Sequence, residues 1–355
     1  MPSTYKPTPT AVPVWLDCDP GNDDAFAILL AAFHPSFRLL GISTVHGNVA
    51  LHKTTRNTLA LLEAMRFTQD EINVFPGEAL PLKVAPLHAE AIHGHYGIGG
   101  AELPENPRLV ENKDFTYLDA MRDAVRENAG EICIVCTGAL TNFANFIKTY
   151  PEDVLKIRYV SIMGGAFDCG NIAPNVEFNM RTDPHAAQIV FNERRLANRI
   201  ALAPLNLTHT ALATSRVQKA IYDSDGENNS PLRLMFLQIL SFYSDAYVKK
   251  YNHTAGPPIH DPLALFLVLP LYAGQHASCA EFADECDFHY LQRNLIVETE
   301  GPEMGRILFE NKDRDPLRVE KGGVYVGQSV NVPFFWKHVL AALASADEQV
   351  FARAE

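Results

Sequence analysis

Apolar residues along the first half of the chain form runs of two alternating lengths. The short run VPVWLD at 12–17 predicts a strand, and the longer run AFAILLAAF at 25–33, which follows a polar turn, predicts a helix. A second pair follows, with a β-branched run at 38–48 and a helical pattern at 57–65. The chain therefore begins as a repeated strand and helix pattern.

The same alternation continues through the middle of the chain. Further strands are predicted at 131–138, 159–165 and 199–205, with helices after the first two of them, the second at 185–195. Residues 212–271 look mainly helical around a turn-rich loop at 223–231, and the chain closes with an amphipathic helix. We expect an α/β fold: an open, mostly parallel sheet with a Rossmann-like core, helices on both faces, and a helical insertion over the C-terminal strand edge.

The ends of the chain and its cysteines bear on domain organisation. Residues 1–11 contain two Thr-Pro units and lack the apolar core of a signal peptide, so we expect a flexible N-terminal arm before a single domain at 12–355. The sequence has no apolar run of membrane-spanning length, and its six cysteines are irregularly spaced. Cys133 and Cys136 should face opposite sides of their strand. We expect a cytoplasmic protein without a membrane contact.

Charge narrows the choice of partners. The 355 residues include 30 Lys and Arg against 42 Asp and Glu, which gives a formal net charge of −12. An acidic protein of this kind repels nucleic acid, so no nucleic-acid partner is expected. The excess of acid either forms an ordinary solvated surface or gathers where a cation binds.

The most informative segment is the acidic loop DCDPGNDDA at 17–25. Its four carboxylates would repel one another by roughly a few kcal/mol at protein-like dielectric unless a cation or protons neutralised them. Oxygen ligands without a Cys or His cluster favour Ca²⁺ or Mg²⁺. Helix capping explains one or two of the four acids. The loop is not an EF-hand, because Ile28 and Leu30 occupy the positions that would need Glu.

Further motifs follow in order: TVHGN at 44–48, IHGHYGIGG at 92–100, TGALTN at 137–142, MGGAF at 163–167, EFNMRTDPHAA at 177–187 and IHDPLA at 259–264. Together with the acidic loop, they resemble the nucleoside hydrolases, the inosine- and uridine-preferring N-ribohydrolases. The resemblance implies a Ca²⁺-dependent enzyme of nucleoside salvage or catabolism that splits ribonucleosides into ribose and free base. It also implies the nucleoside hydrolase fold and a homodimer or homotetramer.

The resemblance assigns roles on the sugar side of the site. It implies that Asp19, Asp24 and Asp261 are carboxylate ligands of Ca²⁺ and that Thr137 adds its backbone carbonyl. Asp19 would also act as the general base on calcium-bound water. The remaining sugar-side positions would bind the ribose; they are Asp23, Asn48, Met163, Asn171, Glu177 and Asn179.

On the base side, His260 matches the family's acid for the leaving group, and His93 matches a position near the substrate. Tyr243 and Tyr247 are four residues apart, so they share a helix face and resemble the family's base-side tyrosines. The purine-selective branch stacks the base between tryptophans, whereas this chain has only Trp15 and Trp336, neither well placed. This difference favours the inosine- and uridine-preferring branch.

Two other functions stay open from the sequence. A non-catalytic protein of the same fold would bind ribose or a nucleoside without turnover. A phosphomonoesterase of the haloacid dehalogenase type also uses a strand that ends in D-x-D, but Gly21 stands here where that family has Thr or Val. The intact Asp19 and His260 favour the enzyme over the binding protein.

Overall fold

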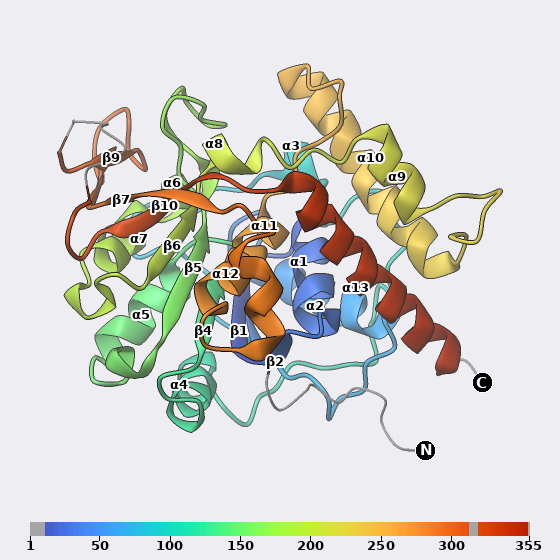
Figure 1. Ribbon diagram of the computed structural model, residues 1–355, viewed down its shortest axis with the longest axis horizontal. Coiled ribbons are helices and arrows are strands. Elements are labelled where there is room, and N and C mark those ends of the chain that lie inside the picture. Colours follow the sequence, from blue (N-terminus) through green and yellow to red (C-terminus); the bar gives the residue numbers. More distant parts are fainter. Residues whose placement is uncertain (1–10, 312–318, 354–355) are drawn as a thin grey trace.

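A twisted sheet of eight strands forms the centre of the protein, as the computed structural model shows for residues 11–311 and 319–353 (Figure 1). The strand order is β3-β2-β1-β4-β5-β6-β10-β7, and every pairing is parallel except that between β10 and β7. This open sheet confirms the expected α/β fold. The strands are β1 (Val12–Cys18), β2 (Phe37–Thr44), β3 (Val74–Pro76), β4 (Cys133–Cys136), β5 (Tyr159–Met163), β6 (Ile200–Ala203), β7 (His289–Arg293) and β10 (Val324–Ser329).

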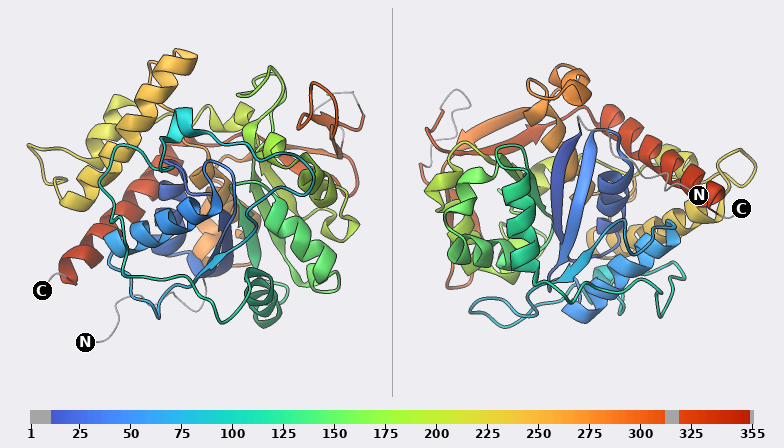
Figure 2. Two further views of the ribbon diagram at one scale, coloured as in Figure 1. Left: turned by 180° about the vertical axis from the view of Figure 1, so that it is seen from behind. Right: turned by 90° about the horizontal axis from the view of Figure 1, so that it is seen from below.

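Helices cover both faces of this sheet, as the view from below shows (Figure 2). On one face, the apolar side chains of β1 pack with α1 (Asp24–Phe33), α2 (Leu51–Ala64), α11 (Asp261–Phe266) and α13 (Val332–Ala352). The other face packs against α4 (Tyr117–Glu127), α5 (Thr141–Thr149) and α7 (Pro184–Phe191). Cys133 belongs to the first core and Cys136 to the second, as their spacing predicted.

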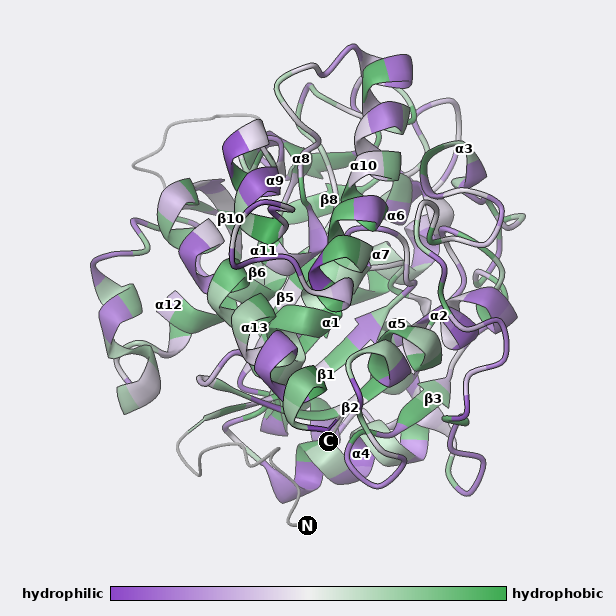
Figure 3. Ribbon diagram, turned by 90° about the vertical axis from the view of Figure 1, so that its right-hand side faces the viewer, coloured by the Kyte–Doolittle hydropathy of each residue, from purple (hydrophilic) through white to green (hydrophobic). Residues whose placement is uncertain are grey.

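The helix that follows the acidic loop is buried along almost its whole length. In α1, the residues from Asp24 to Ala32 are all buried, and the helix packs against α11 and α13. Figure 3 shows it in green at the centre of the molecule. A helix with no solvated face fixes the position of its first residue, so the acidic loop before it has a rigid support.

The predicted helical insertion lies beyond β6. It comprises α8 (Leu205–Thr208), α9 (Ser215–Ile221), α10 (Pro231–Tyr251), α11 and α12 (Val268–Tyr272), and Figure 1 shows α9 and α10 side by side at one end of the molecule. The long helix α10 begins where Ser230 accepts a hydrogen bond from the Arg233 N–H, and it ends at Asn252 in a left-handed conformation (φ 57°). It packs against the short helix α3 (Glu90–His93).

The observed elements differ from the predicted ones in three places. Helix α2 begins at Leu51, six residues before the predicted start at 57, because the polar first turns hide the helical period. Helix α7 ends at Phe191, and a 3₁₀ turn at Arg194–Leu196 takes the rest of the range predicted as helix. The segment containing β3 and α4 carried no predicted element.

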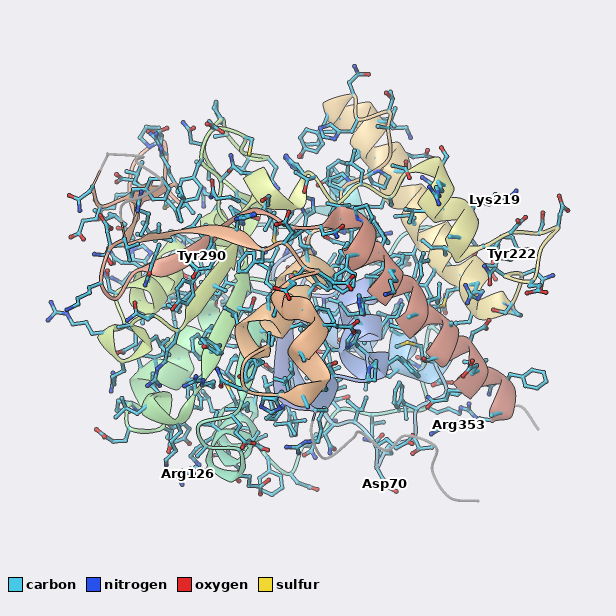
Figure 4. All side chains as sticks on the ribbon, in the orientation of Figure 1. Asp70, Arg126, Lys219, Tyr222, Tyr290 and Arg353 are labelled. Atoms are coloured by element: carbon cyan, nitrogen blue, oxygen red, sulfur yellow. The ribbon has the colours of Figure 1, made fainter. Side chains whose placement is uncertain are left out.

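The remaining elements complete the edges of the molecule. A small antiparallel pair is formed by β8 (Leu295–Val297) and β9 (Ile307–Phe309). Arg353, labelled in Figure 4 at the end of α13, pairs with Glu71 at 2.6 Å. Across the described parts of the chain, no single helix is long and apolar enough to cross a membrane, although the bent pair Asp261–Tyr272 and Ala277–Ala283 meets that length and composition together. Residues 1–10 of the expected arm lie outside the described residues.

Candidate functional site

A hollow of about 120 Å³ opens at the carboxyl ends of the parallel strands, between the sheet and α10. This is the edge at which open α/β sheets bind ligands. The structure brings nearly all of the predicted site residues into its walls; Asp19 and Asp24 are fully buried and are not among the residues that line it. The predicted residues that line it are Asp23, Asn48, His93, Thr137, Met163, Asn171, Glu177, Asn179, Tyr243, Tyr247, His260 and Asp261.

The carboxylates of the acidic loop are held by hydrogen bonds from the loop itself and from residues that follow the neighbouring strands. The Oδ2 atom of Asp24 accepts a hydrogen bond from the Gly21 N–H at 2.8 Å, and its Oδ1 atom accepts one from the Thr137 hydroxyl at 2.9 Å. The Asn48 N–H donates to Asp19 Oδ2 at 2.7 Å. A Cβ atom at Gly138 would lie 2.5 Å from Asp19 Oδ1, so this carboxylate fits only against glycine.

Four carboxylates form a buried cluster at the floor of the hollow. One oxygen atom from each of Asp23, Asp24 and Asp261 lies within 4.8 Å of the others, an arrangement that could hold a metal ion. Asp19, a predicted ligand, is not a member of this triple, but its Oδ1 atom is buried and has no hydrogen-bond partner among the described residues.

Burial disfavours the ionised form of the carboxylates in this cluster. Desolvation is the largest cause of a raised pKa for Asp19, Asp24 and Asp261, and it raises the pKa of Asp23 to about 7. The neighbouring carboxylates raise the pKa of Asp19 and Asp261 further. Because the donors are all oxygen atoms and one of them lacks a partner, the cluster fits a hard divalent cation.

One wall of the hollow is formed by the loop between β5 and α6 (Phe178–Thr182). Glu177 caps α6, with its carboxylate accepting hydrogen bonds from the N–H groups of Asn179 at 2.8 Å and Met180 at 3.1 Å. It also accepts the Gly165 N–H at 2.9 Å. The Asn179 amide donates to the Thr137 carbonyl at 2.7 Å. The carbonyl oxygen of Thr137, a predicted metal ligand, uses one lone pair in this hydrogen bond and keeps the second available for a metal ion. These contacts fix polar side chains around the floor.

A hydrogen-bonded chain of side chains forms the opposite wall. His260, which precedes α11, has its Nδ1 atom 2.7 Å from the Thr208 hydroxyl and its Nε2 atom 2.7 Å from the Tyr247 hydroxyl. The Tyr243 hydroxyl in turn lies 3.2 Å from that of Tyr247. Burial holds the pKa of His260 well below its usual value. Both imidazole nitrogens are therefore engaged, and the Tyr247 hydroxyl stands next to His260 in the wall.

His93 reaches the hollow from α3. The Asn22 N–H donates to its Nδ1 atom at 3.0 Å, which leaves the proton of the neutral ring on Nε2. Burial lowers the pKa of His93 to about 3, so the ring is neutral at physiological pH. It stacks on Tyr243 with ring centroids 5.4 Å apart.

Several residues of the site were not predicted from the sequence. Asn22 links the acidic loop to the backbone carbonyls of Gly99 and Ile239, at 3.0 Å and 2.8 Å. Lys250 and Tyr251 line the hollow from α10. The helical spacing from Tyr247, three and four residues, could have identified these two, whereas no local signal identifies Thr208 or Asn22.

The two tryptophans lie away from this site, as expected. Trp15 is buried in β1, stacked on Phe75, and donates to the Ser43 hydroxyl at 2.9 Å. Trp336 in α13 donates to the Leu212 carbonyl at 3.1 Å. Neither of them is among the residues that line the hollow.

Comparisons with known proteins agree with this geometry. Residues 14–337 match the family model described as inosine-uridine preferring nucleoside hydrolase. The chain is 38% identical to the uridine nucleosidase of Saccharomyces cerevisiae, over 96% of this chain and 98% of that protein. It is 35% identical to a pyrimidine-specific ribonucleoside hydrolase of Escherichia coli, over 73% and 80%. Among solved structures, a purine-preferring ribonucleoside hydrolase from Gardnerella vaginalis has a TM-score of 0.79 at 28% identity, covering 95% of this chain and 99% of that one.

Proposed function

The chain belongs to the family of inosine-uridine preferring nucleoside hydrolases and is a nucleoside hydrolase; on this premise we propose that it cleaves the N-glycosidic bond of uridine and inosine in a calcium-dependent reaction. The products are ribose and the free base. The observation that supports this most directly is a hollow with a buried acidic floor on one side and the His260–Tyr247 pair on the other. Glycosidic cleavage needs both, because the sugar gains positive charge while the base gains negative charge.

The residues that would hold Ca²⁺ are Asp19, Asp24 and Asp261, together with the Thr137 carbonyl. Asp24 and Asp261 already present oxygen atoms within 4.8 Å of each other, and Asp19 Oδ1 is buried without a partner. Calcium, when bound, neutralises this cluster and makes a nearby water a stronger acid. Asp23 lies at the same floor and lines the hollow, where its carboxylate can accept a hydrogen bond from a ribose hydroxyl.

Asp19 is suited to the role of general base. The Asn48 N–H fixes the Asp19 carboxylate through its Oδ2 atom, so the group is held in position to accept the proton of the attacking water. Asn48, Asn171, Glu177 and Asn179 present polar groups to the ribose, and Met163 packs beneath it. Negative charge beside the sugar also stabilises the oxocarbenium-like transition state.

The departing base needs a proton, and the wall opposite the floor provides one. His260 alone would be a poor donor because its Nε2 atom is engaged with the Tyr247 hydroxyl at 2.7 Å. We therefore assign the acid to the pair: Tyr247 gives its proton to the base, and the His260 Nε2–H donates a hydrogen bond to the phenolate oxygen that remains. Tyr243 and His93 pack against one another beside this pair and line the space for the base.

The choice of uridine and inosine rests on the base side of the hollow. Without a tryptophan there, the base meets tyrosine and histidine rings, which suit purines and pyrimidines alike. The yeast relative is described as a uridine nucleosidase and the structural neighbour as purine-preferring, so the family accommodates both kinds of base.

Release of reducing sugar from uridine and inosine, in buffer without phosphate, tests this proposal. Activity should disappear with a strong chelator, return with Ca²⁺, and be lost in Asp19→Ala. Binding of nucleoside without turnover would instead identify a binding protein, and turnover of a generic phosphate ester would identify a phosphatase. The cytoplasmic location and the dimer or tetramer stay predictions, which fractionation and light scattering can check.

A further inference from the structure

Lys250 lies at the end of α10, where that helix meets the loop that carries Asn171. It lines the same hollow as the predicted site residues, and among the described residues it is the one Lys or Arg that does so. Its Nζ atom lies 5.0 Å from the ring centre of Tyr251, and the Tyr251 hydroxyl donates to the Asn171 carbonyl at 3.1 Å. The ammonium group is thus held near the mouth of the hollow by a cation–π contact.

This ammonium group has no carboxylate partner among the described residues, unlike Lys53, which pairs with Glu90. The carboxylates of the hollow lie at its floor, and Lys250 itself is exposed. Its charge acts inside the hollow, because it contributes to the lowered pKa of the buried His93, after desolvation as the main cause. The hollow therefore has an acidic floor and, among the described residues that line it, one Lys or Arg side chain at its entrance.

A neutral nucleoside would occupy the floor and leave this charge unpaired. A nucleoside with a carboxylate or phosphate at its outer end would pair with it. On the basis of the nucleoside hydrolase activity proposed above, we propose that Lys250 determines specificity, so that the site accepts ribonucleosides carrying an anionic substituent at the mouth of the hollow.

Two parts of a nucleoside could carry that substituent. Lys250 follows Tyr247 by three residues, which places it beside the base-side wall. The next residue, Tyr251, contacts Asn171 on the sugar-side loop, so Lys250 also lies towards the sugar side. The anion can therefore sit on the base or on the 5′ carbon of the ribose. The chemistry is the same in both cases: an oxygen anion that accepts hydrogen bonds from an ammonium group.

Matched pairs of substrates test the proposal and separate these two sources. For the base, 5-carboxymethyluridine is compared with 5-carbamoylmethyluridine, and for the 5′ carbon, uridine 5′-carboxylate is compared with uridine 5′-carboxamide. Each pair differs by one charge at nearly constant size. The quantity measured is the ratio of kcat/KM for the acid to that for the amide, in the wild type, Lys250→Ala, Lys250→Arg, Lys250→Glu and Lys249→Ala. Lys249 is the matched control, because it is an exposed lysine of the same helix turn that does not line the hollow.

We expect the ratio in one of the two pairs to fall by about two- to fivefold in Lys250→Ala, the effect of one exposed ion pair, and further in Lys250→Glu. Lys250→Arg and Lys249→Ala should keep the wild-type ratio, and 0.5 M salt should reduce it. Equal ratios in the wild type and Lys250→Ala for both pairs would overturn the proposal. Uridine serves as the reference substrate: turnover of uridine with unchanged ratios refutes only the role of Lys250, whereas no turnover of any nucleoside refutes the hydrolase itself.

Discussion

Replacing Tyr247 by Phe removes the hydroxyl group that contacts the imidazole Nε2 atom of His260. The wild-type hydroxyl lies 2.7 Å from that atom and 3.2 Å from the Tyr243 hydroxyl, and Tyr247 as a whole is 4% exposed. Phenylalanine keeps the ring and its packing, so the substitution removes hydrogen bonds and a proton donor with little change in shape. Its effect on the reaction should depend on how much the departing base needs that proton.

The size of the effect follows from the chemistry of general acids. A positioned acid contributes about 10²- to 10⁴-fold to the rate, so we expect kcat/KM for uridine and inosine to fall by at least about 10²-fold. A nitrophenyl riboside releases a stable anion that needs no proton, so its hydrolysis should fall by less than about fivefold. The unpaired Nε2 atom should also lower the free energy of unfolding by about 1–3 kcal/mol.

The assay compares both kinds of substrate in Tyr247→Phe, His260→Ala and Tyr251→Phe, with thermal unfolding of each variant. Tyr251 is the matched control: it lies one turn further along α10, and its hydroxyl donates to the Asn171 carbonyl instead of to His260. Any loss in Tyr251→Phe should affect both substrates alike. If Tyr247→Phe reduced hydrolysis of the nucleoside and the nitrophenyl riboside equally, Tyr247 would have no part in protonating the base.

Three further predictions follow from the same structure. A chelator should abolish activity and lower the Tm, because the buried carboxylates lose the cation that neutralises them. Added Ca²⁺ should restore both activity and Tm, and an unchanged Tm in the chelator would contradict a cation site in this cluster. Gly138→Ala should reduce kcat by about 10²-fold, because its Cβ would lie 2.5 Å from Asp19 Oδ1 and displace that carboxylate. Gly274→Ala, where no atom lies within 4 Å of the added Cβ, should leave kcat unchanged. His338→Leu should flatten the pH dependence of stability, because burial lowers the pKa of His34 to about 3 and that of His338 to about 4. The unfolded chain therefore binds more protons than the folded one below pH 6.5, and the free energy of unfolding falls by about 1.4 kcal/mol per pH unit for each histidine as the pH drops towards 4. Equal slopes of the free energy of unfolding against pH, measured by urea titration of the wild type and the variant, would refute this.

The sequence predicted those parts of the fold that depend on local pattern. The run at 12–17, the acidic turn and the apolar run at 25–33 became β1, its loop and α1, because their hydrophobic periods are unambiguous. The short strand β3 and the helix α4 were missed. In α4, only Tyr117, Met121 and Val125 are buried, four residues apart, so its apolar stripe is narrow and easily overlooked.

The candidate site was predicted to the extent that its residues lie in short motifs. Such motifs placed His260 and Asp261 next to each other and Tyr243 one turn from Tyr247. They could not show that Thr208 and Tyr247 are hydrogen-bonded to the two ring nitrogens of His260, because Thr208 is 52 residues and Tyr247 is 13 residues away from His260 in the chain. They also could not show Lys250 at the mouth of the hollow, because that depends on how α10 packs over the sheet.

The position of the acidic cluster in the fold explains why so many buried carboxylates are tolerated. Asp24 is the first residue of α1 and Asp261 the first residue of α11, and these two helices pack against each other. Their N-terminal ends, which carry partial positive charge, therefore converge on the cluster. Each such end stabilises a carboxylate by about 0.3–1 kcal/mol, which is less than the several kcal/mol that burial of an ion costs. The helix ends position the carboxylates without neutralising them, so bound protons or a cation must supply the rest of the neutralising charge in this cluster.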